Sequence, residues 1–222
     1  MGCSISYKQH GDNVIGKQAV VVSSAIGSNN AELQAAKKQK LLVVPRAEML
    51  AELMRFRFGI AVAGAHGKTT TTSLIVHILS EAKLDPTYII GGIINATGMN
   101  AKLGKSDYLV AEADESDASF LHLKPMLSVI TNIDEDHMAT YKHNYNNLTK
   151  AFINFTSNLP FYGVCVACID DQGVQDILSK IHRPILSYGF SDDADVKASN
   201  VVQNKMKMNF DVDCQSFQKK FP

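Results

Sequence analysis

Residues 59–72 of this 222-residue chain read Gly59-Ile60-Ala61-Val62-Ala63-Gly64-Ala65-His66-Gly67-Lys68-Thr69-Thr70-Thr71-Thr72. The apolar run at 60–63 is short enough for a parallel strand that is buried on both faces. Gly64 and Gly67 allow the backbone to turn sharply and to approach a ligand closely. A helical spacing follows in Leu74, Ile75, Ile78 and Leu79. The order strand, glycine loop (residues 64–67), helix predicts an α/β fold organised around this loop.

The glycine loop has the chemistry of a phosphate site. Unpaired N–H groups at the start of the helix favour an anion, and Lys68 adds a positive charge. Thr69 or Thr70 supplies a hydroxyl that suits Mg²⁺. The spacing is Gly-x-x-Gly-Lys-Thr-Thr and not the full Walker A pattern, because Val62 stands where that pattern needs glycine. We expect a triphosphate as ligand; the alternative is a glycine turn beside a surface lysine.

The composition favours a folded domain with a sizeable core. The chain is 45% hydrophobic and 20% charged, and its 22 Lys and Arg balance its 22 Asp and Glu. A zero net charge argues against a general binder of nucleic acids. No apolar run reaches the length of a membrane span, and residues 1–10 lack the apolar core of a signal peptide. We therefore expect a cytoplasmic protein.

Two of the four cysteines, Cys165 and Cys168, match C-x-x-C. The surrounding residues 163–169 are typical of a buried strand, on which positions three apart point to opposite faces. No second Cys or Cys/His pair has zinc spacing. These cysteines are expected to be core residues.

Strands and helices alternate along most of the chain, which predicts a mostly parallel sheet. Strands are expected at 19–23, 41–44, 60–63, 87–90, 108–112, 127–130, around 164 and at 185–188. Helices are expected at 31–40, 46–56, from 68, at 146–159 and at 172–181. Residues 195–202 and 205–213 are expected to form a small antiparallel hairpin.

We expect two domains. Residues 1–56 fit the C-terminal part of a Rossmann-like domain, since they contain no glycine-rich opening turn between a first strand and helix. Residues 57–222 fit a P-loop-type ATP-binding domain. We expect this second domain to be incomplete at its C-terminus.

Polar residues follow two of the predicted strands. Glu112 ends one strand, and Asp134 to His137 follow another. Ligands of an open parallel sheet bind beyond the carboxyl ends of its strands, so both clusters can meet the glycine loop at one nucleotide. Glu112 and the Thr69 hydroxyl suit Mg²⁺. Imidazole is an unusual Mg²⁺ ligand, so the chemistry of His137 alone favours a structural histidine over a metal ligand.

The remaining polar residues leave alternatives open. Asp114, Glu115 and Asp117 are also consistent with a solvent-exposed acidic loop, and His66 with a spacer in the glycine loop. The sequence indicates no general base beside any serine, so a serine nucleophile is not expected. The site is expected to position groups and neutralise charge, as phosphoryl transfer requires.

Several stretches together resemble the Mur ligase family. The first is the loop at 64–72. The others, in order, are residues 23–26 (SSAI), 46–55 (RAEMLAELMR), 112–121 (EADESDASFL), 131–133 with 136–141 (TNI and DHMATY), 158–163 (NLPFYG) and 187–190 (SYGF). These stretches are spread over almost the whole chain.

The resemblance implies an enzyme of peptidoglycan synthesis that uses ATP and Mg²⁺. It implies that the carboxylate of UDP-N-acetylmuramate is phosphorylated by ATP and that the acyl phosphate then reacts with the amine of L-alanine. The implied catalytic residues are Lys68, Glu112 and His137. The implied nucleotide-binding residues are Gly64, Ala65, His66, Gly67, Lys68, Thr69, Thr70 and Asn132. The implied Mg²⁺ ligands are Thr69, Glu112 and His137, and the UDP-sugar would lie near Ser23, Ser24, Ser116 and Asp117.

The sequence also departs from the family pattern. Ala65 replaces the usual threonine, which removes a hydroxyl but keeps the backbone cradle. The family's glycine-rich first strand and turn and its third domain, which supplies the amino-acid site, are not in this sequence, so we expect a partial chain. The alternatives are a murein tripeptide ligase, a nucleotide-binding module without turnover, and a truncated product that folds poorly.

Overall fold

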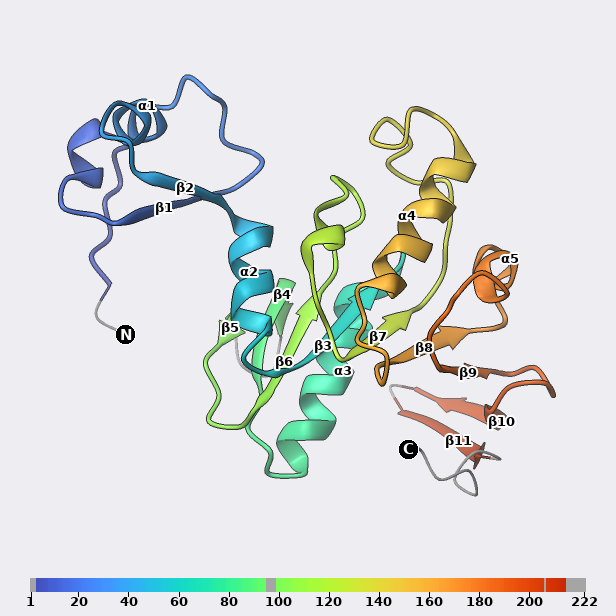
Figure 1. The fold of residues 1–222 in the computed structure, drawn as a ribbon. Helices are drawn as coiled ribbons and strands as arrows, with labels where there is room; N and C mark the ends of the chain where they lie inside the picture. Colours follow the sequence, from blue (N-terminus) through green and yellow to red (C-terminus); the bar gives the residue numbers. More distant parts are fainter. Residues whose placement is uncertain (1–2, 95–98, 206, 215–222) are drawn as a thin grey trace. The chain divides into compact units, whose positions relative to one another are not determined.

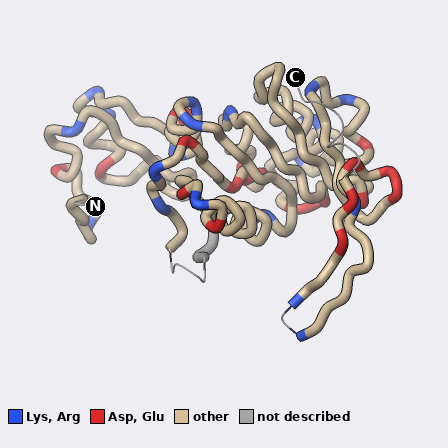
Figure 2. Tube along the Cα trace, turned by 90° about the horizontal axis from the view of Figure 1, so that it is seen from below, with Lys and Arg blue, Asp and Glu red and all other residues tan. Residues whose placement is uncertain are grey.

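The computed structural model describes residues 3–94, 99–205 and 207–214 (Figure 1). The chain divides into two compact units, Met1–Leu53 and Met54–Pro222. Basic and acidic residues are both spread along the trace of the two units, in keeping with the zero net charge (Figure 2).

Unit one has a two-stranded parallel sheet and a covering helix. Strand β1 (Ala19–Val22) pairs with β2 (Leu42–Pro45) in the register Ala19↔Leu42. Between them lies α1 (Ala31–Lys38), whose predicted cap Asn30 accepts hydrogen bonds from the N–H groups of Glu32 and Leu33. A 3-10 helix, η1 (Gly11–Val14), precedes β1, and α2 (Arg46–Met54) follows β2.

Unit two is built on one mixed sheet whose central strands are parallel. In the described residues its order is β11-β10-β9-β8-β7-β3-β6-β4-β5. Strands β6, β3, β7, β8 and β9 pair in parallel, whereas the two outermost pairs, β4 with β5 and β10 with β11, are antiparallel. The bounds are β3 (Phe58–Ala63), β4 (Thr87–Ile94), β5 (Met99–Lys102), β6 (Tyr108–Glu112), β7 (Leu127–Ile130), β8 (Val164–Cys168), β9 (Ile185–Gly189), β10 (Val196–Asn204) and β11 (Lys207–Cys214). The fold class is therefore the predicted one.

Helices cover both faces of this sheet. Helix α3 (Lys68–Glu81) connects β3 to β4, and α4 (Tyr145–Ser157) and α5 (Gln172–Leu178) follow β7 and β8. The first connection runs toward the β4 edge and the other two toward the β9 edge. Right-handed crossovers in opposite directions place α3 on one face and α4 and α5 on the other, as Figure 1 shows.

The connections change direction between β3 and β7, which are neighbours in the sheet. A crevice opens beyond the carboxyl ends of two strands at such a point, and ligands of open α/β sheets bind there. The residues after Ala63 and after Ile130 lie at these strand ends. The topology therefore gives both segments a place at one site.

Strand β3 is the best-buried part of the sheet. Ala61, Val62 and Ala63 are fully buried, as expected for a strand covered by helices on both faces. Under α4, Phe120 of η2 (Ser119–His122) packs with its ring centroid 5.3 Å from that of Phe152 and 5.1 Å from that of Phe155. This aromatic cluster anchors the segment that follows β6.

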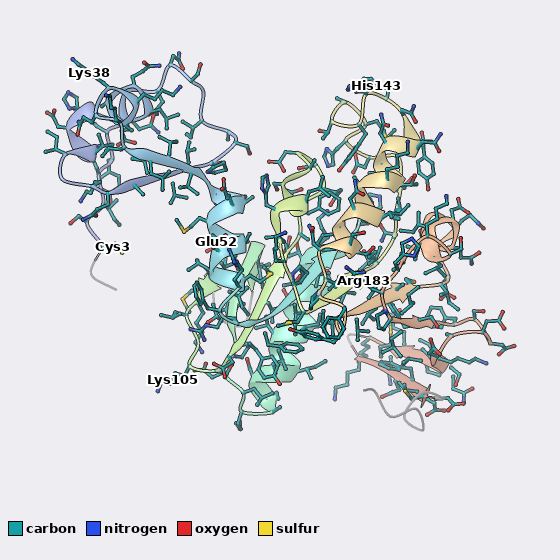
Figure 3. The ribbon with its side chains drawn as sticks, viewed as in Figure 1. Cys3, Lys38, Glu52, Lys105, His143 and Arg183 are labelled. Atoms are coloured by element: carbon teal, nitrogen blue, oxygen red, sulfur yellow. The ribbon has the colours of Figure 1, made fainter. Side chains whose placement is uncertain are left out.

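Arg183 fixes the end of α4 to the start of β9. Its Nε donates to the carbonyl oxygen of Leu159 at 2.8 Å, and its Nη2 donates to that of Ser157 at 3.0 Å. Its side chain is labelled in Figure 3. The carbonyl of Ser157, the last residue of α4, thereby gains a partner from outside the helix.

The structure differs from the sequence prediction at β4, which runs through Gly91 to Ile94 instead of ending at Ile90. A Cβ atom at Gly91 would lie 2.9 Å from the Glu112 Oε2 atom. This glycine therefore allows a close approach to a side chain of β6 and does not end the strand. Strand β5 was not predicted, because its alternation of apolar and polar residues, Met99 to Lys102, is only four residues long, and all four are exposed.

The C-x-x-C residues lie on β8 as predicted, with Cys165 buried and Cys168 half-buried. Helices α4 and α5 end earlier than predicted, at Ser157 and Leu178. No helix in the described ranges is long and apolar enough to cross a membrane.

Candidate functional site

The glycine loop joins β3 to α3 and leaves the start of the helix open. Gly64 has φ +141°, and a Cβ there would lie 2.1 Å from the Thr131 Oγ1 atom. Gly67 is the N-cap of α3 in the left-handed region, with φ +81°, and a Cβ added there would have no heavy atom within 4 Å. Because no side chain in the described part of the chain caps this end of α3, its first N–H groups are available to an anion.

The segment after β7 clamps the glycine loop from the neighbouring strand. The amide of His66 donates to Asn132 Oδ1 at 2.8 Å, and Asn132 Nδ2 donates to the His66 carbonyl oxygen at 2.9 Å. Thr131 Oγ1 donates to the same carbonyl oxygen at 2.8 Å. Asn132 thus lies beside the loop, and its role in nucleotide binding stays a prediction. Its amide is occupied with the loop backbone.

The ammonium group of Lys68 folds back over the glycine loop. Its Nζ donates to the carbonyl oxygens of Gly64, at 2.7 Å, and Ala65, at 3.2 Å. It also donates to Glu115 Oε1 at 3.0 Å and lies 2.9 Å from Glu115 Oε2. The ion pair is largely out of water, because the side chains of Lys68 and Glu115 are only 16% and 3% exposed.

Glu115 is buried and is not part of an exposed acidic loop. Burial raises the pKa of its carboxyl group, and the hydrogen bond from Lys68 acts in the opposite direction. The hydroxyl of Tyr141 donates to the Glu115 backbone carbonyl. Burial, with the nearby Glu115 carboxylate, also raises the pKa of this phenol.

Glu112 lies at the end of β6, opposite Val62 of β3 in the sheet register. Its Oε1 atom is buried, and no hydrogen-bond partner for it is found among the described residues. A buried carboxylate oxygen without a partner is costly unless a cation or a donor satisfies it. Glu112 therefore fits a cation ligand better than a structural role.

The predicted Mg²⁺ ligands fit the ion unequally. The Thr69 hydroxyl and the Glu112 carboxylate are oxygen donors, which Mg²⁺ prefers. His137 has φ +51°, and its Nε2 atom lies 3.6 Å from Asp136 Oδ2. Within the described ranges no group of three or more His, Cys, Asp and Glu side chains could hold a metal ion. A site made of Thr69 and Glu112 would thus need ligand oxygens and water to complete it.

The other predicted site residues lie in three places. Ser116 and Asp117 follow β6, where the Ser116 N–H donates to Asp114 Oδ1 at 3.0 Å and Thr140 Oγ1 donates to the Ser116 carbonyl. His66 points its Nε2 atom to Asp134 Oδ2 at 3.5 Å, with both side chains exposed. Ser23 and Ser24 belong to unit one, just after β1. The roles of these residues stay predictions.

The sequence did not reveal three residues that shape the site. Thr131 holds the glycine loop, Glu115 holds Lys68, and Tyr141 holds the backbone of Glu115. Nothing local distinguishes Glu115 from the acidic residues beside it. Only its position under the loop, which the sheet order sets, makes it different.

Two family models match the chain. The Mur ligase middle domain matches residues 62–221, and the Mur ligase family catalytic domain matches residues 1–58. Proteins named UDP-N-acetylmuramate–L-alanine ligase are 64% identical in Vesicomyosocius okutanii, over 222 residues, and 56% identical in Hydrogenovibrio crunogenus, over 212 residues. These matches cover 100% and 96% of this chain but 47% and 46% of the relatives. The chain spans about half the length of the curated relatives that it matches.

Solved structures have the same fold. The UDP-N-acetylmuramate:L-alanyl-gamma-D-glutamyl-meso-diaminopimelate ligase from Neisseria meningitides has a TM-score of 0.80 at 24% identity, over 93% of this chain and 68% of that one. The UDP-N-acetylmuramate–alanine ligase from Thermotoga maritima has a TM-score of 0.79 at 22% identity. The match covers 94% of this chain and 46% of the Thermotoga chain. Since the middle-domain model alone covers well over half of the sequence, the chain belongs to the Mur ligase family.

Proposed function

We propose that this chain is part of an ATP-dependent ligase that joins L-alanine to the carboxylate of UDP-N-acetylmuramate during peptidoglycan synthesis. Relatives that carry this name are 64% and 56% identical to it. Mur ligases use ATP. Because the chain spans about half of those relatives, the activity is proposed for the whole protein and nucleotide binding for this part.

The open N-terminus of α3 beside the Lys68 ammonium is the observation that carries the proposal. A nucleotide's phosphates would meet the first N–H groups of α3 and the backbone of the glycine loop. Ala65 fits this role, since the backbone of the loop and not its side chain forms the cradle. Lys68 would steady the phosphate that is transferred, because a positive charge stabilises the charge that develops there.

Mg²⁺ would be held by Thr69 and Glu112, with His137 as the predicted ligand of a second ion. When bound, the ion neutralises phosphate charge during the transfer. The Oε1 atom of Glu112, for which the described residues offer no partner, supports this assignment from the protein side. Asn132 keeps the glycine loop in the shape that receives the phosphates.

Residues 1–56 are proposed to form part of a UDP-sugar-binding domain and residues 57–222 the central ATP-binding domain. Ser23 and Ser24 would face the UDP-sugar from the first domain, and Ser116 and Asp117 from the second. L-alanine would bind mainly outside this chain.

A murein tripeptide ligase is the second candidate. The Neisseria enzyme, whose structure has a TM-score of 0.80, is by its name a ligase of the same UDP-sugar and a tripeptide. The full-length protein separates the two candidates. Phosphate release that depends on L-alanine supports the first. Release that depends on the tripeptide, with none on L-alanine, supports the second.

Calorimetric titration of the chain with Mg²⁺–ATP tests the nucleotide site. Wild type is expected to bind, and Lys68→Ala to bind at least about tenfold more weakly while its fold stays intact. Adding UDP-N-acetylmuramate shows whether the sugar site works in the same chain. An equal ATP affinity of wild type and Lys68→Ala would refute the site.

A further inference from the structure

We propose that Glu115 is a positioning residue for Lys68. In the nucleotide complex the Glu115 carboxylate stays bound to the Lys68 ammonium group. A phosphate of the nucleotide replaces the carbonyl oxygens of Gly64 and Ala65 as the other partners of that ammonium group. The inference rests on the proposed nucleotide site. It adds a residue to which the sequence had assigned no role.

The hydrogen-bond capacity of Lys68 is fully used in this structure. An ammonium group has three N–H donors and no acceptor. The Nζ atom has three hydrogen-bond acceptors, namely Gly64 O, Ala65 O and Glu115 Oε1. A phosphate oxygen can therefore bind the ammonium only by exchange for one of these partners.

The carbonyl oxygens are the partners that can be given up. They are neutral, and losing a neutral acceptor costs less than losing a charged one. The Glu115 carboxylate is 3% exposed. Separating it from Lys68 would leave a buried charge without a counter-ion, which is strongly unfavourable. Exchange of the carbonyls keeps the ion pair and turns the ammonium toward the loop opening.

The backbone of Glu115 is itself held from another segment. The Tyr141 hydroxyl donates to the Glu115 carbonyl oxygen, and the Thr140 hydroxyl donates to that of Ser116. Both hydroxyls follow the segment that carries Asp136 and His137. This arrangement fixes where the carboxylate stands, and through it where the ammonium stands, so Tyr141 acts on Lys68 indirectly.

A purely structural role explains the burial of Glu115 poorly. Burial raises the pKa of this carboxyl group, which means that the charged form is disfavoured there despite Lys68. Removing one member of such a pair leaves the other charge largely buried without a counter-ion, so Glu115→Gln is expected to lower stability as well as ATP affinity. The double-mutant cycle below separates the two effects, because a loss of stability alone does not depend on the phosphate contact of Lys68.

The test is a double-mutant cycle on the full chain, read by calorimetric titration with Mg²⁺–ATP. Glu115→Gln is expected to weaken binding roughly 10- to 100-fold, the usual effect of one charged hydrogen bond. In the Lys68→Ala background the same substitution is expected to have no further effect, because Glu115 acts through Lys68. Glu115→Asp, which keeps the charge, is expected to recover part of the affinity.

Two further variants provide a control and an independent test. Glu81→Gln makes the same chemical change at an exposed position at the far end of α3 and is expected to bind like wild type. Tyr141→Phe removes only the hydroxyl and is expected to weaken binding by a smaller factor. It gives an independent reading should Glu115→Gln fail to fold.

The outcomes separate this inference from the proposed function. The inference is wrong if Glu115→Gln binds ATP with wild-type affinity, or if the losses of affinity in the two single variants multiply in the double mutant. Neither result contradicts nucleotide binding by wild type. If wild type and Lys68→Ala bind ATP equally, the nucleotide site itself is wrong and the inference falls with it. A Glu115→Gln variant that still unfolds cooperatively, binds ATP more weakly than wild type and adds no loss to Lys68→Ala supports the inference.

Discussion

Asn132 and His66 form a reciprocal pair in which one side-chain amide satisfies both backbone groups of a loop residue. The Asn132 Oδ1 atom accepts from the His66 N–H at 2.8 Å, and the Nδ2 group donates to the His66 carbonyl oxygen at 2.9 Å. The two residues are 66 positions apart in the chain. The pair therefore connects the ends of β3 and β7 across the point where a ligand of such a sheet binds.

Asn132→Ala removes both hydrogen bonds and is expected to lower the free energy of unfolding by about 1–3 kcal/mol. The glycine loop loses its fixed shape, so Mg²⁺–ATP binding should weaken as well. Urea unfolding and calorimetry measure the two effects. Asn132→Asp is the matched variant, since it keeps an acceptor for the His66 amide but cannot donate to the carbonyl. An Asn132→Ala chain with wild-type ATP affinity would show that the clamp is irrelevant to binding.

The two loop glycines are expected to differ sharply in their tolerance of a methyl group. In Gly64→Ala the new Cβ would lie 2.1 Å from Thr131 Oγ1 at φ +141°, so we expect a loss of about 2–4 kcal/mol in unfolding free energy. In Gly67→Ala no heavy atom lies within 4 Å, and only the left-handed backbone costs about 1 kcal/mol. Urea unfolding without nucleotide compares them. Equal losses would mean that steric contact with Thr131 is not what selects glycine at position 64.

Glu112→Gln is expected to leave the stability of the nucleotide-free chain unchanged or slightly higher. The reason is that the substitution removes a negative charge whose Oε1 atom is buried and has no partner in the described residues. The gain in melting temperature from Mg²⁺–ATP should disappear in this variant, whereas ATP with EDTA should act alike on both proteins. Melting curves of both proteins under these conditions measure this. A full Mg²⁺-dependent gain in Glu112→Gln would exclude Glu112 as a ligand.

Cys165 gives the chain a pH dependence in the alkaline range. Burial raises the pKa of its thiol from 9.0 to about 11. The folded chain therefore holds this proton more tightly than the unfolded chain, and the associated stability is complete below pH 9 and is lost as the pH rises to about 11. By about pH 10.5 the loss should reach about 2 kcal/mol.

Cys165→Ala should lack this component of the pH dependence. Urea unfolding at about pH 8 and about pH 10.5 gives the difference, since the other titrating groups are common to both proteins. Cys3→Ala, at an exposed cysteine, is the control and should behave like wild type. Parallel pH profiles of wild type and Cys165→Ala would contradict the prediction.

The sequence by itself determined the local parts of this protein. Ile60 to Ala63, the glycines at 64 and 67 and Lys68 predict strand, loop and helix, because apolar periodicity and backbone freedom are properties of neighbouring residues. The alternation of strands and helices predicted the parallel sheet, and the cap at Asn30 and the hairpin of β10 and β11 were found as predicted. The motifs also identified the family.

Only the tertiary structure decided which distant side chains meet. Glu115 and Lys68 are 47 positions apart, and nothing local separates Glu115 from Asp114 or Asp117. The sheet order places β6 and β7 on either side of β3, and so delivers Glu115 and Asn132 to the glycine loop. Burial, ion pairing and the continuation of β4 past Gly91 depend on these neighbours, because they follow from packing between segments and not from the propensity of any one segment.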